Sequence, residues 1–429
     1  MLQSAILTLT ALSVQISLQA QWPVVELGRS AALPIGLCEP SISINRQNPQ
    51  NLVAGVILDQ VFHSNDGGKT WQRDTLTSPY GVYGDPVVIS DYEGNQYYFH
   101  LSDPSGNNWG SEKFLDRIVC QKSSNGGKTW NEGTFMGLNP PKDQDKHWAV
   151  ADPFTNRIHV TWTQFDKYGS TDSSDKSNIY YAYSKDGGET WTPGQRINQF
   201  AGNCLDSDQT TEGAVPAVGP QGQLYVAWAY NEKIYFDRLS SPEDTTWLPQ
   251  DKIVAGQPGG WDISISGLDR ANGMPVTVAD VSFGPHRGTI YVNWVDKRRG
   301  NYDVYVSKST DEGNTWSAPK RINNDTGKAD QFFTWMACDP YTGFLYAVFY
   351  DRRHYPGSDS TEVFLAYSRD GGENWENEKI SEAPFVPNDE IFMGDYNHID
   401  AYQNRVRPVW THYEKGTLSI KTALISVRP

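Results

Sequence analysis

Short runs of apolar and aromatic residues alternate along the chain with turns rich in glycine, proline and aspartate. Seven times, one such run leads through a turn into a second run. Six of these second runs end on an aromatic residue: Phe99, Trp162, Trp228, Trp294, Phe349 and Trp410. The first copy, at residues 45–57, lacks the aromatic residue. Short runs bounded by turn residues predict β-strands, and the sequence is poor in long helical patterns.

A second pattern, eight residues long, occurs five times. The copies read SNDGGKTW, SSNGGKTW, SKDGGETW, STDEGNTW and SRDGGENW. Their third positions hold Asp66, Asn125, Asp186, Asp311 and Asp370. A side-chain oxygen at this position can accept hydrogen bonds from the backbone of its own turn, and the glycines permit positive φ. We interpret the unit as a structural turn whose tryptophan packs between neighbouring sheets; a ligand-binding role is the alternative.

The spacing of the units counts the repeats. They end at Trp71, Trp130, Trp191, Trp316 and Trp375, so the steps are 59, 61, 125 and 59 residues. The long step indicates a further repeat, and residues 242–247 look like an eroded copy of the unit. Together with the strand pattern this gives seven repeats of roughly 58 residues, enough for four strands each. The units resemble Asp boxes, the BNR repeat of sialidase-like β-propellers.

We therefore predict an all-β fold, a single seven-bladed β-propeller of four-stranded antiparallel blades. Six blades, as in the familiar sialidase propeller, are the alternative. The last repeat offers only three strands, at residues 398–401, 406–411 and 418–425. We expect residues 24–27 to supply its outer strand, because closing the ring in this way removes an exposed sheet edge.

The N-terminus indicates export. An apolar run at residues 5–18 is too short to span a bilayer, so we assign residues 1–20 to a signal peptide and residues 21–429 to the Asp-box propeller. We expect a secreted, periplasmic or cell-surface protein without a membrane span. A net charge of −15 gives no general attraction for nucleic acid or anionic membranes.

Cysteine and histidine add little to this prediction. Cys120 and Cys338 lie in strand-like runs and are expected to be buried thiols, whereas Cys38 and Cys204 lie in loops and are the better disulfide candidates. The spacing of His and Cys does not match a zinc site. We expect no cofactor, although a structural Ca²⁺ is possible.

Strand alternation places two sets of loops on the face where propellers usually bind ligands. Residues before the inner strands include Glu39, Asp85, Asp145, Lys146, His147, Glu212, Asp330, Gln331, Asp395 and Tyr396. Residues after the second strands include Asp166, Tyr230, Asp296, Arg298, Asp351, Arg352, Arg353 and His412. Six of seven inner strands are thus preceded by an acid. These acids either perform acid–base or ligand chemistry with arginines as anion clamps, or cap strand N–H groups at a wet channel mouth.

The family resemblance implies a more specific site. Sialidases clamp the substrate carboxylate with three arginines and use a Tyr nucleophile, a Glu and an Asp acid. Glu212, Tyr396 and Asp85 are the candidates for these catalytic roles. Ligand-binding candidates are Arg352, Arg353, Asp351, Asp395, Glu39, Lys146, His147 and Arg298. The family's Arg-Ile-Pro motif before the first box is absent, which is a departure from the sialidase pattern.

We predict a sialidase-like propeller that recognises or processes glycans through the channel-mouth face, as a glycan-binding module or a component of a surface complex. An exo-glycosidase, either a sialidase or another hydrolase or lyase, is one alternative. A protein-interaction scaffold without enzymatic activity is another. The expected partner is a glycan or glycoconjugate, with a surface protein complex as a further candidate.

Overall fold

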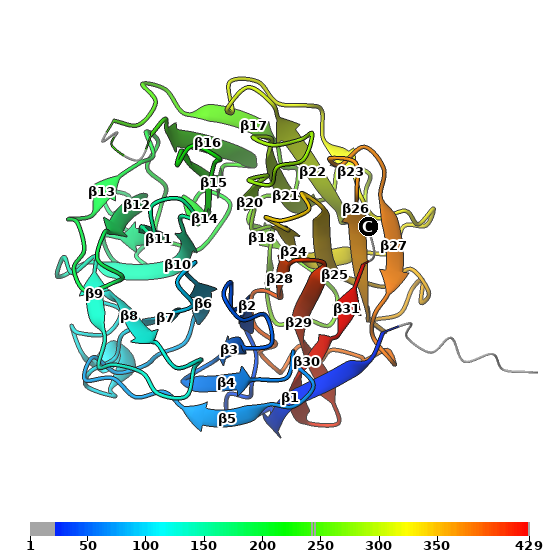
Figure 1. Cartoon of the computed structure of the whole chain (residues 1–429), viewed down its shortest axis with the longest axis horizontal. Coiled ribbons are helices and arrows are strands. Elements are labelled where there is room, and N and C mark those ends of the chain that lie inside the picture. The colour runs from blue at the N-terminus through cyan, green and yellow to red at the C-terminus, as the bar shows by residue number, and fades with distance from the viewer. Residues whose placement is uncertain (1–21, 242, 244–245, 428–429) are drawn as a thin grey trace, which may run out of the picture.

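Seven antiparallel sheets are arranged in a ring (Figure 1). Residues of all seven inner strands line a central channel. The computed structural model describes residues 22–241, 243 and 246–427. Every sheet places the first strand of its repeat innermost. The prediction of a seven-bladed, four-stranded propeller is therefore confirmed, and the six-bladed alternative is wrong.

The strands are assigned to blades in chain order. Blade 1 contains β2 (Ser41–Ile44), β3 (Leu52–Val56), β4 (Gln60–Ser64) and β5 (Gln72–Thr75). Blade 2 contains β6 (Val87–Ser90), β7 (Gln96–Leu101), β8 (Ile118–Ser123) and β9 (Thr134–Met136). Blade 3 contains β10 (Asp143–Ala151), β11 (Ile158–Phe165), β12 (Ser177–Ser184) and β13 (Gln195–Arg196). Blade 4 contains β14 (Glu212–Val218), β15 (Leu224–Tyr230), β16 (Lys233–Leu239) and β17 (Lys252–Gly256). Blade 5 contains β20 (Val276–Ala279), β21 (Ile290–Asp296), β22 (Asp303–Ser309) and β23 (Lys320–Arg321). Blade 6 contains β24 (Gln331–Cys338), β25 (Leu345–Asp351), β26 (Glu362–Ser368) and β27 (Glu376–Lys379). Two elements lie outside the blades, the hairpin β18 (Asp262–Ile263) with β19 (Ala271–Asn272) and the 3₁₀-helix η1 (Asn108–Gly110).

The seventh blade joins the two ends of the chain. Its inner strands are β28 (His398–Tyr402), β29 (Arg405–Glu414) and β30 (Thr417–Ala423), and β31 (Ile425–Ser426) pairs with β29. The N-terminal β1 (Val24–Ala31) pairs antiparallel with β30 as the outer strand, as predicted, and extends four residues beyond the predicted segment. In Figure 1 the blue β1 lies beside the red β30. This pairing covers the edge of β30 and closes the ring.

Aromatic pairs across the second and third strands fill the interior of four consecutive blades. The pairs are Trp162–Tyr180, Trp228–Tyr235, Trp294–Tyr305 and Phe349–Phe364, with centroids 5.9, 6.3, 6.2 and 6.4 Å apart. Each pair consists of residues directly opposite each other in the strand register. Cross-strand pairing of large rings buries much area at each blade, which explains why the aromatic residue recurs with the repeat.

The Asp boxes form self-contained turns. Asp66 Oδ1 accepts hydrogen bonds from the backbone N–H groups of Lys69 and Thr70 at 2.9 and 3.0 Å and from the Ser64 hydroxyl at 2.8 Å. Burial raises the pKa of Asp66, but these hydrogen bonds outweigh it and lower the pKa to about 2. Asn125 accepts the equivalent bond from Thr129 N–H at 3.0 Å. These contacts are those of a structural turn, as the sequence interpretation proposes.

Box tryptophans pack against the preceding blade. Trp191 meets Phe99 edge to face at 6.0 Å, and Trp316 meets Phe236 in the same way at 5.1 Å. Trp247, at the end of the proposed eroded unit, is buried and meets Tyr181 of blade 3 at 5.3 Å. It therefore occupies the place of a box tryptophan, although part of residues 242–247 lies outside the described chain.

All four cysteines are free thiols, and Cys38, Cys120 and Cys204 are buried. The two disulfide candidates, Cys38 and Cys204, are therefore not disulfide-bonded, and Cys338 is partly rather than fully buried. The proposed signal peptide, residues 1–20, lies outside the described residues. Over the described chain, no helix has the length and apolar character needed to cross a membrane.

Candidate functional site at the channel mouth

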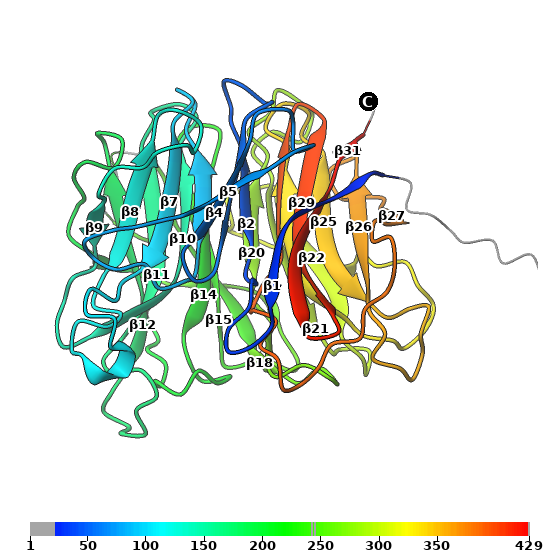
Figure 2. The same cartoon turned by 90° about the horizontal axis from the view of Figure 1, so that it is seen from below.

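The residues that precede the inner strands meet around one mouth of the central channel. Figure 2 shows this face along its lower edge, where β18 and the cyan coil of η1 also lie. Three charged residues here have left-handed backbone conformations, with φ of 53° at Glu39, 47° at Asp85 and 47° at Lys146. Such a conformation costs an L-residue about 1–2 kcal/mol, and strained backbone of this kind clusters at functional sites.

Asp395 is the centre of the polar contacts at the mouth. Lys146 Nζ lies 2.5 Å from Asp395 Oδ2 and 3.6 Å from Asp85 Oδ2. Arg270 donates from Nε to Asp395 Oδ1 at 2.6 Å and from Nη2 to Oδ2. The Asp395 N–H donates to Glu39 Oε1 at 3.1 Å. Both cations of the cluster are thus held by one carboxylate whose side chain is only 1% exposed.

Arg270 and Asp206 belong to this cluster, although the repeat pattern does not predict them. Arg270 comes from the hairpin β18–β19, inserted between blades 4 and 5, and Asp206 from the loop between blades 3 and 4. Their side chains lie 3.5 Å apart. Asp206 also accepts hydrogen bonds from Trp261 Nε1 at 2.7 Å and the Tyr168 hydroxyl at 3.0 Å. The 125-residue step between boxes is close to the length of two repeats, so it does not indicate the inserted hairpin.

A pocket of about 280 Å³ opens beside the cluster. Its polar lining consists of Glu39, Asp85, Asp145, Lys146, Arg270 and Asp395. Its aromatic lining consists of Tyr83, Trp109, Phe114, Tyr168 and Phe392. Trp109, from η1, is 60% exposed, and its ring stacks on Tyr168 with centroids 5.6 Å apart and an angle of 22°. The pocket combines a few converging polar groups with an exposed aromatic surface, as small-molecule sites commonly do.

The acids of the mouth differ in protonation. Burial raises the pKa of Asp145 to about 8 and that of Glu39 and Glu212 well above the usual range. Burial acts in the same direction on Asp395, yet Lys146 and the second cation, Arg270, hold the pKa of that carboxyl below its usual range. One site therefore holds protonated and ionised carboxyl groups at neutral pH, an arrangement typical of acid–base chemistry.

Glu212 and Tyr396, the candidate catalytic pair, have different surroundings. Tyr396 is 4% exposed, and its ring packs edge to face on Trp148 at 5.1 Å. Burial and then Glu39 raise the pKa of Tyr396 well above its usual range. The acidic neighbours of Glu212 are Asp206 and Asp145. No hydrogen bond joins Glu212 to Tyr396, so the structure does not form the Tyr–Glu pair that the family resemblance implies.

Arg298 and Arg352, two of the predicted ligand-binding arginines, do not line the mouth pocket. Arg298 forms an ion pair with Asp296, and its guanidinium carbon lies 4.5 Å from the ring centroid of Tyr305. Arg352 lies 3.1 Å from Asp359 and donates to the Thr361 hydroxyl at 3.1 Å. Both side chains stabilise nearby segments of the propeller.

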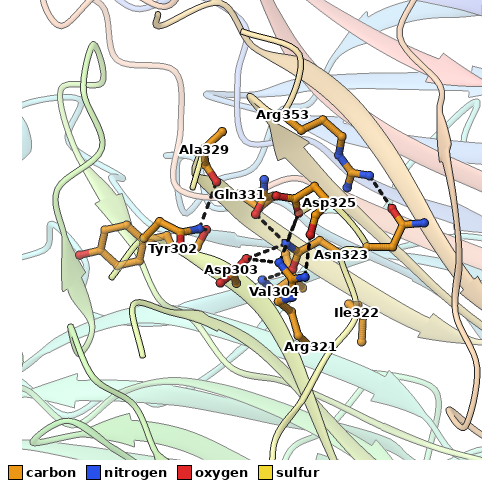
Figure 3. Close-up of polar contacts among 12 residues, drawn as sticks. Tyr302, Asp303, Val304, Arg321, Ile322, Asn323, Asp325, Ala329, Gln331 and Arg353 are labelled. Atoms are coloured by element: carbon orange, nitrogen blue, oxygen red, sulfur yellow. Dashed lines mark hydrogen bonds and ion pairs between the residues drawn. The ribbon is translucent and has the colours of Figure 1, made fainter. Parts of the chain in front are cut away.

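Arg353 and Asp351 are likewise engaged with each other. Arg353 lies 2.6 Å from Asp351, and its guanidinium carbon lies 4.1 Å from the ring centroid of Phe364. Gln331 donates to the same Asp351 carboxylate at 3.2 Å and accepts from Asn323 at 2.7 Å. Figure 3 shows Arg353 beside this polar cluster of blades 5 and 6. Asp351 is therefore enclosed by its own blade and is not presented to a ligand.

His147 is buried below the mouth, and burial lowers its pKa to about 4. A neutral imidazole can bind a metal, but such a site needs several ligands. Across the described part of the chain, no group of three or more His, Cys, Asp or Glu residues is placed to hold a metal ion.

Comparison with known proteins agrees with this architecture. The BNR/Asp-box repeat model matches residues 62–73 and 182–193. A sialidase from Bacteroides fragilis is 24% identical over 290 residues, which cover 62% of this chain and 49% of that protein. The chain thus aligns with about half of the length of this curated relative.

Solved structures of other proteins align with this chain at low identity. The NanB sialidase from Streptococcus pneumoniae superposes with a TM-score of 0.50 at 11% identity, covering 87% of this chain and 83% of that one. A protein of unknown function from Dyadobacter fermentans gives a TM-score of 0.49 at 12% identity, covering 94% and 99%. The chain is a seven-bladed propeller that carries BNR/Asp-box repeats and is distantly similar to a sialidase.

Proposed function

We propose that the protein binds an uncharged sugar residue of a glycan in the mouth pocket and hydrolyses its glycosidic bond. The observation that carries this proposal is that both cations of the pocket already form ion pairs with carboxylates of the protein. Lys146 and Arg270 already contact Asp395, and they also lie within 3.6 Å of Asp85 and Asp206 respectively. A substrate carboxylate would have to displace one of these protein carboxylates.

The distant sialidase relative supports a glycan as ligand, but the charges of this site do not favour sialic acid. A sialoside carries a carboxylate that needs free cationic groups for binding. Arg298, Arg352 and Arg353 are engaged elsewhere, and the pocket is lined by four acids and two cations. Hydroxyl groups can instead hydrogen-bond to protonated and ionised carboxyls alike.

The acids supply a reasonable mechanism for hydrolysis. Asp145, protonated at neutral pH, would donate its proton to the glycosidic oxygen as the bond to the anomeric carbon breaks. The ionised carboxylate of Asp395 would stabilise the positive charge that develops on the sugar. Water then adds to the anomeric carbon, and its proton returns to Asp145.

Binding without turnover is the second candidate, and Trp109 favours it. Its ring is 60% exposed at the pocket and held in place by stacking on Tyr168. A fixed aromatic face packs well against the C–H face of a sugar ring and loses little entropy on binding.

We further propose export to the cell surface or beyond, on the basis of the N-terminal apolar run and the glycan ligand.

The test uses the purified chain and a panel of fluorogenic glycosides of glucose, galactose, mannose, arabinose and N-acetylneuraminic acid. We expect turnover of at least one uncharged glycoside, its loss in Asp145→Asn, and unchanged turnover in Asp74→Asn, a surface control. Turnover of the sialoside would overturn the proposed specificity. If calorimetry detects a sugar whose binding requires Trp109 but no glycoside is cleaved, the second candidate holds. If the assays detect no binding and no turnover, both candidates are refuted.

A further inference from the structure

The aromatic pairs of the blades differ in what covers them. In blades 5 and 6, the fourth residue after the strand aromatic is an arginine, Arg298 or Arg353, and its guanidinium lies over the pair. In blade 3 the corresponding residue is Asp166, which forms an ion pair with Lys142 and so does not cover the rings. The pair of blade 3 therefore lacks the cation that covers the pairs of blades 5 and 6.

A groove of about 490 Å³ lies at this place, between the outer part of blade 2 and blade 3. Phe135, Leu138, Tyr180 and Trp191 line it, and Trp162 lies buried at its base. This volume is within the range of pockets that hold small ligands. The groove lies on the side of the ring, and none of its lining residues lines the mouth pocket.

Two glycines keep the groove open. A Cβ atom on Gly137 or Gly194 would lie 3.2 or 3.1 Å from the Trp162 ring, so the backbone itself packs on the indole. Gly194 is the third residue after the box tryptophan, and the third residue after the blade-5 box tryptophan is Pro319. The chain therefore fills this position with a ring in one blade and leaves it without a side chain in the other.

Trp191 is fixed as a rigid wall of the groove. Its Nε1 donates to Thr134 Oγ1 in the neighbouring blade at 2.9 Å. In three other boxes the indole of Trp71, Trp130 or Trp375 instead donates to a carbonyl of its own turn, as Trp71 does to Gly68 at 3.0 Å. A ring tied across two blades is held in position before any ligand arrives, which reduces the entropy lost on binding.

We propose that this groove is a second saccharide-binding site that holds an uncharged sugar unit of a glycan chain. Among the described residues none with a charged side chain lines it, and its polar groups include two amides and the hydroxyls of Thr192 and Tyr180. Asn139 donates to Gln164 at 3.0 Å, which orients both amides and leaves further donor and acceptor positions for sugar hydroxyls. The proposal takes its ligand class from the proposed function, but it does not require the mouth pocket to be catalytic.

Calorimetric titration of the purified chain with maltohexaose, cellohexaose and mannohexaose tests this site. We expect at least one hexaose to bind, and Asn139→Ala and Leu138→Ala, both changes of exposed side chains, to weaken binding tenfold or more. Gly194→Pro, which places the blade-5 residue in the groove, should have the same effect. Pro319→Gly is the matched control in blade 5 and should leave affinity unchanged, with thermal unfolding used to check that each variant is folded.

The outcomes separate this site from the mouth. Hexaose binding that survives Asp145→Asn and Trp109→Ala but is lost in the groove variants supports the second site, whatever the glycoside assay shows. Binding that is lost only in the mouth variants overturns the groove and leaves the proposed function intact. If none of the three hexaoses binds at millimolar concentration, the groove proposal is also overturned.

Discussion

Replacing Asp395 by Asn should destabilise the protein strongly, because Asp395 is the buried partner of both mouth cations. Asn keeps the size of the side chain but removes its charge. Lys146 is 6% exposed and would be left next to a neutral amide. Arg270 is 41% exposed and can turn toward water, so its loss of a partner should contribute less.

The magnitude follows from burial. Breaking a buried ion pair by removing one partner costs about 3–5 kcal/mol, since the remaining charge stays desolvated. Asp85, 3.6 Å from Lys146, offers partial compensation, so we expect about 3 kcal/mol for Asp395→Asn. The double variant Asp395→Asn with Lys146→Met removes the orphaned charge and should recover most of the loss.

Denaturant unfolding followed by tryptophan fluorescence measures these differences. A loss below about 1 kcal/mol for Asp395→Asn, in a range typical of surface pairs, would refute the inference that the ion pair is buried and structurally required. The pH dependence gives a second check. Since the folded pKa of Asp395 is lowered, its contribution is present above the unfolded pKa of about 3.9 and is lost as pH falls toward the folded value.

Three further predictions concern the mouth and the repeat. The folded pKa of Asp145, about 8, exceeds its usual value, so the stability that this group contributes falls as pH rises from about 4 to about 8. Asp145→Asn removes this pH-dependent loss, so the melting temperature of the variant should rise relative to that of the native protein across this pH range. A difference in melting temperature that stays constant with pH would contradict the raised pKa. Asp66→Asn should cost under about 0.5 kcal/mol because Asn125 makes the same turn, while Asp66→Ala should cost about 1–2 kcal/mol of unfolding free energy; equal costs would argue against the hydrogen bonds. Gly213→Ala should lower the melting temperature and cost at least about 1–2 kcal/mol of unfolding free energy. The reason is that Gly213 has φ of 75° and an added Cβ would lie 2.5 Å from the Trp261 ring. An unchanged melting temperature would show that this segment relaxes freely.

The acids at the mouth could be predicted because their position in the repeat fixes their face. Glu39, Asp85 and Asp395 precede inner strands and Asp145 lies near the start of β10, and inner strands begin at one end of the ring. Their roles could not be predicted in the same way. Whether an acid is protonated depends on burial and on the nearest cation, and the second cation, Arg270, arrives from an insertion outside the repeat.

The arginines illustrate the opposite case. Arg298 and Arg353 follow second strands on the predicted face, yet each folds back on an aromatic ring of its own blade. A long side chain has many rotamers, and sequence position gives only its point of attachment. The direction in which it points is settled by the ring and carboxylate within reach.

The sequence by itself determined the seven blades, the closure by β1 and the turn chemistry of the boxes, because these depend on local hydrogen bonds and a period carried by every repeat. Only the tertiary structure decided which cations meet Asp395, where Trp109 stands and why one interblade groove remains open. These features join segments far apart in the chain, and their geometry depends on packing between insertions that follow no repeat.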